Sequence, residues 1–160
     1  MKRLLIALLL VSNFATAATD WLSSETDTGT QFFLFKSPQI IARYDFEADT
    51  YLDPIELSDV PGAFAINDKY IVVAYENAVY RLDKDGQNET HLGNTADSVN
   101  GLFIMNSTVF AAHSDGITSL NIETGETIET HESHYSMAGF TFNTSSMRAY
   151  ARSLRVSPSD

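Results

Sequence analysis

Short apolar segments alternate with turn residues along the chain, and the pattern recurs about every 40 residues. Three such segments occur in each of two clear copies, at 63–67, 70–74 and 79–82 and then at 102–106, 108–112 and 117–122. The copies close on the dipeptides Asp85-Gly86 and Thr124-Gly125. Short apolar segments bounded by turn residues are typical of β-strands. A fixed period of three strands followed by a fourth predicts the blades of a β-propeller.

Two sets of residues mark this period. Asparagines follow apolar segments at spacings of 39 and 37 residues, and large apolar residues end segments ahead of a turn at spacings of 36 and 40. The asparagines are Asn67, Asn106 and Asn143, and the apolar markers are Phe46, Leu82 and Ile122. We expect the members of each set to share one position in the blade. The uninterrupted apolar run Tyr70–Ala74 predicts a strand that neighbouring blades cover on both faces.

The rest of the chain fits the same succession of strands. Three apolar segments precede the clear copies, at 31–35, 40–46 and 51–57, and Met147–Ala151 stands where the repeat places another strand. A helix is the competing interpretation for 147–155, because its residues favour that state. We predict an all-β fold, a partial β-propeller of about three to four antiparallel blades over residues 31–160, incomplete at its C-terminal end. A plain β-sandwich with similar strands is the alternative.

The N-terminus has the pattern of an export signal. Two basic residues precede the apolar run Leu4–Val11, and Ala15-Thr16-Ala17 offers the small residues at which signal peptidases cleave. The run is much shorter than the roughly 20 residues that a membrane span needs. We expect a signal peptide over residues 1–17, a polar lead-in over 18–30, and a chain exported to the periplasm or beyond the cell. No stable membrane insertion is expected after cleavage, and an uncleaved anchor is the alternative.

The amino-acid composition limits the kinds of site and partner that the protein can have. The chain has 160 residues and no cysteine, which excludes disulfides, cysteine metal ligands and thiol catalysis. The net charge is −11, which would repel a phosphate backbone, so we expect no nucleic-acid partner. Six acids and no base lie within residues 44–60, and we expect them on a solvated blade edge. Arg148, Arg152 and Arg155 gather near the C-terminus, where we expect a strand face that a continuing sheet would meet.

A turn motif gives a resemblance to a known family. Leu120-Asn-Ile-Glu-Thr-Gly125 resembles the Leu-Asp-x-x-Thr-Gly turn of secreted bacterial β-propellers of the quinoprotein-like and YVTN-like kinds, and looser copies begin at Arg81 and Arg43. The resemblance implies a turn that joins the third strand of a blade to the fourth. The tryptophan that ends quinoprotein blades is missing, since the only Trp is Trp21. The resemblance therefore implies a fold and carries over no cofactor.

One polar segment has the side chains of a zinc site. His131, Glu132 and His134 offer two imidazoles and a carboxylate, which hold zinc where they converge. Residues three apart on a strand face opposite ways, so the two imidazoles would converge only across a bend. Exposed polar residues of a strand end and loop are the competing interpretation.

A second polar segment has the character of a calcium loop. Asp83, Asp85 and Glu89 supply carboxylates within seven residues, the ligand type that calcium prefers. Gly86 directly after Asp85 suits an ordinary hairpin turn, which is the competing interpretation. We expect no cofactor other than this candidate calcium, and no residue is assigned a catalytic role.

The sequence favours a binding role over catalysis. We expect an exported, non-catalytic binding or scaffolding module that presents blade loops to a protein or glycan partner. No phosphate loop or nucleophile elbow occurs in the sequence. The alternative is the N-terminal part of a propeller enzyme of the lyase, lactonase or dehydrogenase type, whose active site would need further blades. Open blade faces would also allow self-association.

Overall fold

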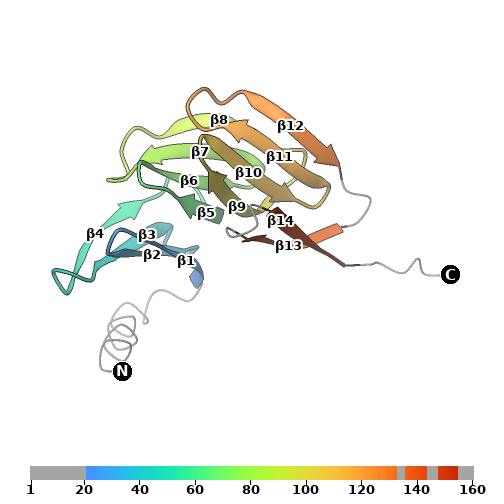
Figure 1. Ribbon diagram of the computed structural model, residues 1–160. Coiled ribbons are helices and arrows are strands. Elements are labelled where there is room, and N and C mark those ends of the chain that lie inside the picture. The colour runs from blue at the N-terminus through green and yellow to red at the C-terminus, as the bar shows by residue number, and fades with distance from the viewer. Residues whose placement is uncertain (1–20, 133–135, 144–147, 155–160) are drawn as a thin grey trace.

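Fourteen strands make up the computed structural model over the residues that it describes, 21–132, 136–143 and 148–154 (Figure 1). Consecutive strands pair into four antiparallel sheets, numbered here as blades 1 to 4. Blade 1 comprises β1 (Trp21–Asp27), β2 (Thr30–Phe35), β3 (Ile40–Asp45) and β4 (Thr50–Glu56). Blade 2 comprises β5 (Pro61–Ile66), β6 (Tyr70–Tyr75), β7 (Ala78–Asp83) and β8 (Thr90–Asn94). Blade 3 comprises β9 (Val99–Met105), β10 (Thr108–His113), β11 (Gly116–Asn121) and β12 (Thr127–Glu132). Blade 4 comprises β13 (Ser136–Asn143) and β14 (Arg148–Leu154).

The blades lie side by side around their first strands. β1 contacts β5, β5 contacts β9, and β9 contacts β13, while the fourth strand forms the outer edge of blades 1 to 3. Figure 1 shows the sheets spreading from this centre like a fan. A β-sandwich would instead set two sheets face to face. The fold is therefore all-β and propeller-like, as the sequence predicted. Among the described residues, no helix is long and apolar enough to cross a membrane.

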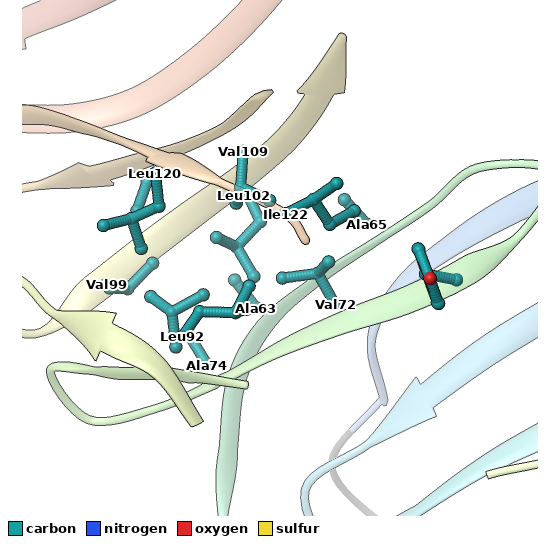
Figure 2. Close-up of a cluster of buried hydrophobic side chains, with 13 residues drawn as sticks. Ala63, Ala65, Val72, Ala74, Leu92, Val99, Leu102, Val109, Leu120 and Ile122 are labelled. Atoms are coloured by element: carbon teal, nitrogen blue, oxygen red, sulfur yellow. The ribbon is translucent and has the colours of Figure 1, made fainter. Parts of the chain in front are cut away.

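Strand β6 illustrates why the blades stack. All six of its residues are buried, and they alternate between two hydrophobic clusters. The cluster between blades 2 and 3, drawn in Figure 2, includes Tyr70, Val72 and Ala74. The cluster between blades 1 and 2 includes Ile71, Val73 and Tyr75. Because successive side chains point to opposite faces of a strand, all of them can be buried only where both faces are covered. This confirms the interpretation of the continuous apolar run.

The turn after the third strand packs each blade against the outer strand of the blade before it. Gly86 and Gly125 lie in this turn with φ of 87° and 74°, a region that other residues rarely adopt. A Cβ on Gly86 would lie 2.5 Å from the Ile55 side chain in β4, and one on Gly125 would lie 2.5 Å from the Leu92 carbonyl oxygen in β8. The close approach between blades explains why glycine closes both copies of the motif.

An arginine in the third strand joins each of the first two blades to the next. Arg43 Nη1 donates to the Lys84 carbonyl oxygen at 3.3 Å, and Arg81 Nη1 donates to the Ile122 carbonyl oxygen at 2.9 Å. Donor and acceptor are 41 residues apart in both cases. The Arg-x-Asp sequences at 43–45 and 81–83 therefore have one repeated role, linking a third strand to the turn of the following blade.

One of the two sequence markers needs correction. The asparagines follow or end first strands, as predicted. Among the apolar markers, Leu82 lies within β7, whereas Phe46 and Ile122 lie one residue beyond β3 and β11. The equivalent residues are Tyr44, Leu82 and Leu120, each one before the end of its third strand and spaced by 38 residues. Phe46 fits the apolar pattern without being in a strand because its ring packs edge-on against Tyr44, with centroids 5.4 Å apart.

Blade 1 has a strand that the sequence pattern did not reveal. A polar lead-in was expected over 18–30, but Trp21–Asp27 form β1 and pair with β2. The segments at 31–35, 40–46 and 51–57 are consequently the second, third and fourth strands of this blade. Most residues of β1 are exposed, so the strand leaves no apolar signature. The expected strand around Met147–Ala151 is confirmed by β14 from Arg148 onward, while residues 1–17 lie outside the described part.

Candidate functional site

One end of the fan carries two kinds of loop. There the second strand of each blade turns into the third, and the chain passes from each fourth strand to the next blade. In blade 3 the paired residues at this end form a row across the sheet, consisting of Val99, His113, Gly116 and Glu132. We call this the His113 end. Its loops at 95–98 and 114–115 bring the connection from blade 2 beside the tip of blade 3.

His113 is the unusual side chain at this end. Only 1% of it is exposed, and its Nε2 lies 3.1 Å from the Thr118 hydroxyl. Its Nδ1 is buried and has no hydrogen-bond partner among the described residues. A buried polar atom without a partner is unfavourable by about 1–3 kcal/mol, so packing alone gives no reason for a histidine at this position.

Asp97 supplies a charged group next to His113. Its carboxylate accepts a hydrogen bond from the Ser114 hydroxyl and one from the Ser98 amide at 2.7 Å. These two hydrogen bonds, together with the nearby His113, lower the pKa of Asp97 below its usual value. Asp97 is therefore ionised at neutral pH, and its exposed position leaves it open to a partner.

Blade 2 holds the loop that carries Asp97. The Thr95 amide donates to the Asn77 carbonyl oxygen at 2.8 Å, and the Thr95 hydroxyl lies 2.6 Å from the Asp97 carbonyl oxygen. The Val99 amide donates to the Glu76 carbonyl oxygen at 2.7 Å. Because these contacts tie both ends of the loop to the β6–β7 turn, the carboxylate has a defined position relative to the imidazole of blade 3.

Two of the three predicted zinc ligands, His131 and Glu132, lie within the described residues. His131 and Glu132 end β12, on the same end of blade 3 as His113. His131 Nε2 lies 3.1 Å from a Glu129 carboxylate oxygen, and both side chains are largely exposed. Consecutive strand residues face opposite ways, which separates His131 from Glu132. His134 lies outside the described residues.

The predicted calcium ligands each have a protein partner. Asp83 accepts from the Asn88 side-chain amide at 2.6 Å, and Asp85 accepts from the Gln87 backbone amide at 3.0 Å, both within the β7–β8 turn. Glu89 accepts from the Tyr75 hydroxyl at 2.7 Å and from the Ser58 hydroxyl at 3.0 Å. Burial and this contact with Glu89 raise the pKa of Tyr75. In the part of the chain that is described, no three His, Asp or Glu residues are grouped as a metal site.

Sequence reasoning missed His113 and Asp97, although the repeat contains a signal for the first. His113 ends β10 and pairs with the first residue of β11, as Tyr75 ends β6 and pairs with the first residue of β7. A histidine thus stands where blade 2 has an aromatic residue. A polar residue at a repeat position that is otherwise apolar indicates a role other than packing in the core. For Asp97, a loop acid, the sequence offers no comparable signal.

Comparisons with known proteins show a likeness of fold. No family model matches the chain, and no curated protein matches it by sequence. The computationally designed Ika4 protein is similar over 84% of this chain and 91% of its own, with 13% identity and a TM-score of 0.66. The designed Ika8 protein is similar over 84% of this chain and 46% of its own, with 15% identity and a TM-score of 0.65. Hydrazine synthase of Kuenenia stuttgartiensis is similar over 78% of this chain and 39% of its own, with 16% identity and a TM-score of 0.67.

These likenesses support a propeller-like repeat fold and no specific function. Identities of 13 to 16% are too low to transfer an activity. The chain spans less than half the length of the Ika8 and hydrazine synthase chains.

Proposed function

We propose that the protein is an exported, non-catalytic binding or scaffolding module that contacts a protein or glycan partner at the His113 end. The observation that carries this proposal is the buried imidazole of His113, whose Nδ1 has no hydrogen-bond partner within 21–132, 136–143 and 148–154, next to the ionised and exposed Asp97. The module belongs, on this proposal, to the secreted bacterial propellers that its turn motif resembles. Loops held by a rigid β scaffold are common places for binding residues.

The hydrogen bonds at this end favour binding over nucleophilic catalysis. The Ser114 hydroxyl donates to Asp97, and the hydroxyl within reach of the His113 imidazole is that of the buried Thr118. A serine nucleophile would need an imidazole as its hydrogen-bond partner. Carboxylates, by contrast, accept hydrogen bonds from sugar hydroxyls and from Lys or Arg side chains. Asp97, Asp115 and Glu132 supply three exposed carboxylates at this end.

Removing two of these charges tests the binding proposal. We expect the Asp97→Asn, Asp115→Asn double variant to bind its ligand at least tenfold more weakly, because charge-assisted hydrogen bonds contribute about 1.5–3 kcal/mol each. The ligands would be found on an array of glycans and an array of Lys- and Arg-rich peptides, and Kd measured by calorimetry. The matched control is Glu47→Gln, Asp68→Asn, which removes two exposed charges at the opposite end. Equal weakening by both double variants, or no binding to either array, would contradict the proposal.

Export has its own test. The full chain, expressed in a Gram-negative bacterial host, should be recovered from the periplasm or the medium. Its mass should be that of a chain cleaved after Ala17 or Ala18. The Ala17→Glu, Ala18→Glu variant should keep the precursor mass, because signal peptidases need small residues at the cleavage point. Ser24→Glu, a control beyond the expected signal, should be processed normally. An unprocessed wild-type chain in the cytoplasm would refute the export part of the proposal while leaving the binding part open to its separate test.

A further inference from the structure

Blade 2 carries aromatic rings at positions where blade 3 has threonine. Tyr80, the third residue of β7, pairs with His91 of β8, and the two ring centroids lie 5.0 Å apart. The Tyr75 ring lies 5.2 Å from that of Tyr80. In blade 3 the third residue of β11 is Thr118, which pairs with Thr130 of β12. Because threonines build the same part of the sheet in blade 3, the fold does not require aromatic rings at these positions.

These rings extend from the core to the surface of the protein. Tyr75 belongs to the hydrophobic cluster between blades 1 and 2, and the half-buried Tyr80 packs against that cluster. His91 lies on the outer strand β8 and is exposed. Aromatic rings attract the weakly positive C–H groups of a ligand to their negative faces. The rings therefore offer an apolar contact at the surface, and small-molecule sites are commonly lined by such rings with a few polar groups beside them.

Glu89 places a carboxylate beside the rings. It accepts from the Tyr75 hydroxyl at 2.7 Å and from the Ser58 hydroxyl at 3.0 Å, and both hydrogen bonds go to the same oxygen, Oε1. The second oxygen, Oε2, has no hydrogen bond to any residue that the structure describes, and the side chain is exposed. Because the two bonds to Oε1 hold the carboxylate in place, Oε2 is an acceptor with a defined position next to the rings.

His91 and Asn94 add an acceptor and a donor. His91 Nε2 lies 3.1 Å from Asn94 Oδ1, and because an amide oxygen can only accept, Nε2 carries the hydrogen. In the neutral imidazole Nδ1 is then an acceptor, while the Asn94 amide nitrogen carries two N–H donors. Both residues are exposed, and in the described part of the chain neither Nδ1 nor this nitrogen has a hydrogen-bond partner. The surface around the rings thus presents both acceptors and donors.

We propose that the blade 2 site, formed by Tyr75, Tyr80, Glu89, His91 and Asn94, binds a pyranose sugar. A pyranose has an apolar C–H face and hydroxyl groups that both donate and accept, so it can use the rings, the two acceptors and the amide donor together. An ammonium or guanidinium group only donates and would leave the Asn94 amide without a partner. The rings also contact one another, which leaves no space between them to enclose such a cation. A sugar is therefore the ligand that fits all of these groups.

Saturation-transfer NMR on the full chain tests the proposal. The blade 2 site does not include Asp97 or His113, so it adds to the partner proposed at the His113 end and does not depend on it. The probes are the methyl glycosides of glucose, galactose, mannose, fucose, xylose and N-acetylglucosamine, of which at least one should receive saturation through its ring hydrogens. The Tyr80→Thr, His91→Thr double variant, which copies blade 3, should raise the Kd of that glycoside about tenfold, because it removes two aromatic contacts.

A second variant and two controls locate the site. Glu89→Gln should also raise the Kd about tenfold, because it removes the charge of the acceptor. Glu126→Gln changes an exposed acid that likewise directly precedes a fourth strand, and it should leave the Kd unchanged. The Asp97→Asn, Asp115→Asn variant should bind the glycoside normally, which separates this site from the His113 end. Circular dichroism would establish that each variant is folded.

Four results would overturn the proposal. They are the absence of saturation transfer to every glycoside, wild-type affinity in the folded Tyr80→Thr, His91→Thr variant, equal weakening by Glu89→Gln and Glu126→Gln, and loss of binding in the Asp97→Asn, Asp115→Asn variant. Arginine methyl ester is the cationic probe. If it bound at the blade 2 site in place of the glycosides, the ligand would be a cation and the assignment to a sugar would fail.

Discussion

Replacing Ile71 with alanine lowers the free energy of unfolding by about 3 kcal/mol, since truncation of a buried isoleucine typically removes 2–5 kcal/mol. Ile71 is fully buried and belongs to the cluster that holds blades 1 and 2 together. The neighbouring Val72→Ala should lower it by about 2 kcal/mol through the cluster between blades 2 and 3. Chemical denaturation at one fixed protein concentration measures both effects, because self-association would make stability depend on concentration.

A matched isoleucine provides the comparison. Ile128 is 56% exposed in β12, so Ile128→Ala should change the free energy of unfolding by less than about 0.5 kcal/mol. If Ile71→Ala and Ile128→Ala had the same small effect, β6 would not lie between two packed blades. If Ile71→Ala alone were harmless, the contact between blades 1 and 2 would be absent while that between blades 2 and 3 remained.

Gly116→Ala should lower the free energy of unfolding by about 3 kcal/mol or more. Gly116 begins β11 with a φ of 151°, and a Cβ there would lie 1.9 Å from the His131 carbonyl oxygen of the paired strand β12. Backbone rather than a flexible side chain would have to move, so β12 must shift away from β11. Thermal and chemical denaturation measure the loss.

Gly29→Ala separates the effect of a positive φ from the effect of a clash between the new Cβ and neighbouring backbone. Gly29 has a φ of 83°, but no atom of the described part of the chain lies within 4 Å of a Cβ placed on it. Its replacement should lower the free energy of unfolding by only about 1–2 kcal/mol, the usual effect of a side chain in the left-handed region. Equal losses at the two glycines would mean that β11 and β12 are not paired closely at Gly116.

The buried strands of this fold could be predicted from the sequence, and an exposed one could not. The run at Tyr70–Ala74 is apolar without interruption because two blades cover β6, so packing leaves a direct trace in the sequence. β1 is covered mainly on the side of β2 and β5, and its residues are mostly polar. Backbone pairing holds such a strand in place, and pairing requires no particular side chains.

Turn lengths account for the imprecise spacing of the apolar markers. The turns between the third and fourth strands of blades 1 to 3 span residues 46–49, 84–89 and 122–126, so they differ in length. Apolar residues open the first and last of these turns, and the sequence gives no way to tell Phe46 and Ile122 from the strand ends. The period is regular only when it is measured within the strands.

The candidate site was less predictable than the fold. Sequence clustering drew attention to His131 and Glu132, which lie at the appropriate end of blade 3 but point to opposite faces of β12. His113 and Asp97 are 16 residues apart and meet only because the β8–β9 connection passes the tip of β10. Proximity that arises from the connection between two blades has no local sequence pattern.

The arginine tethers between blades bear on how such a chain can diversify. In both tethers the acceptor is a backbone carbonyl oxygen. It belongs to a lysine at residue 84 and to an isoleucine at residue 122. Substitution of the side chain at the accepting position leaves the bond intact, because every residue has a carbonyl. A duplicated blade would therefore dock on its neighbour from the moment it arose, and its outward side chains would be free to diverge afterwards.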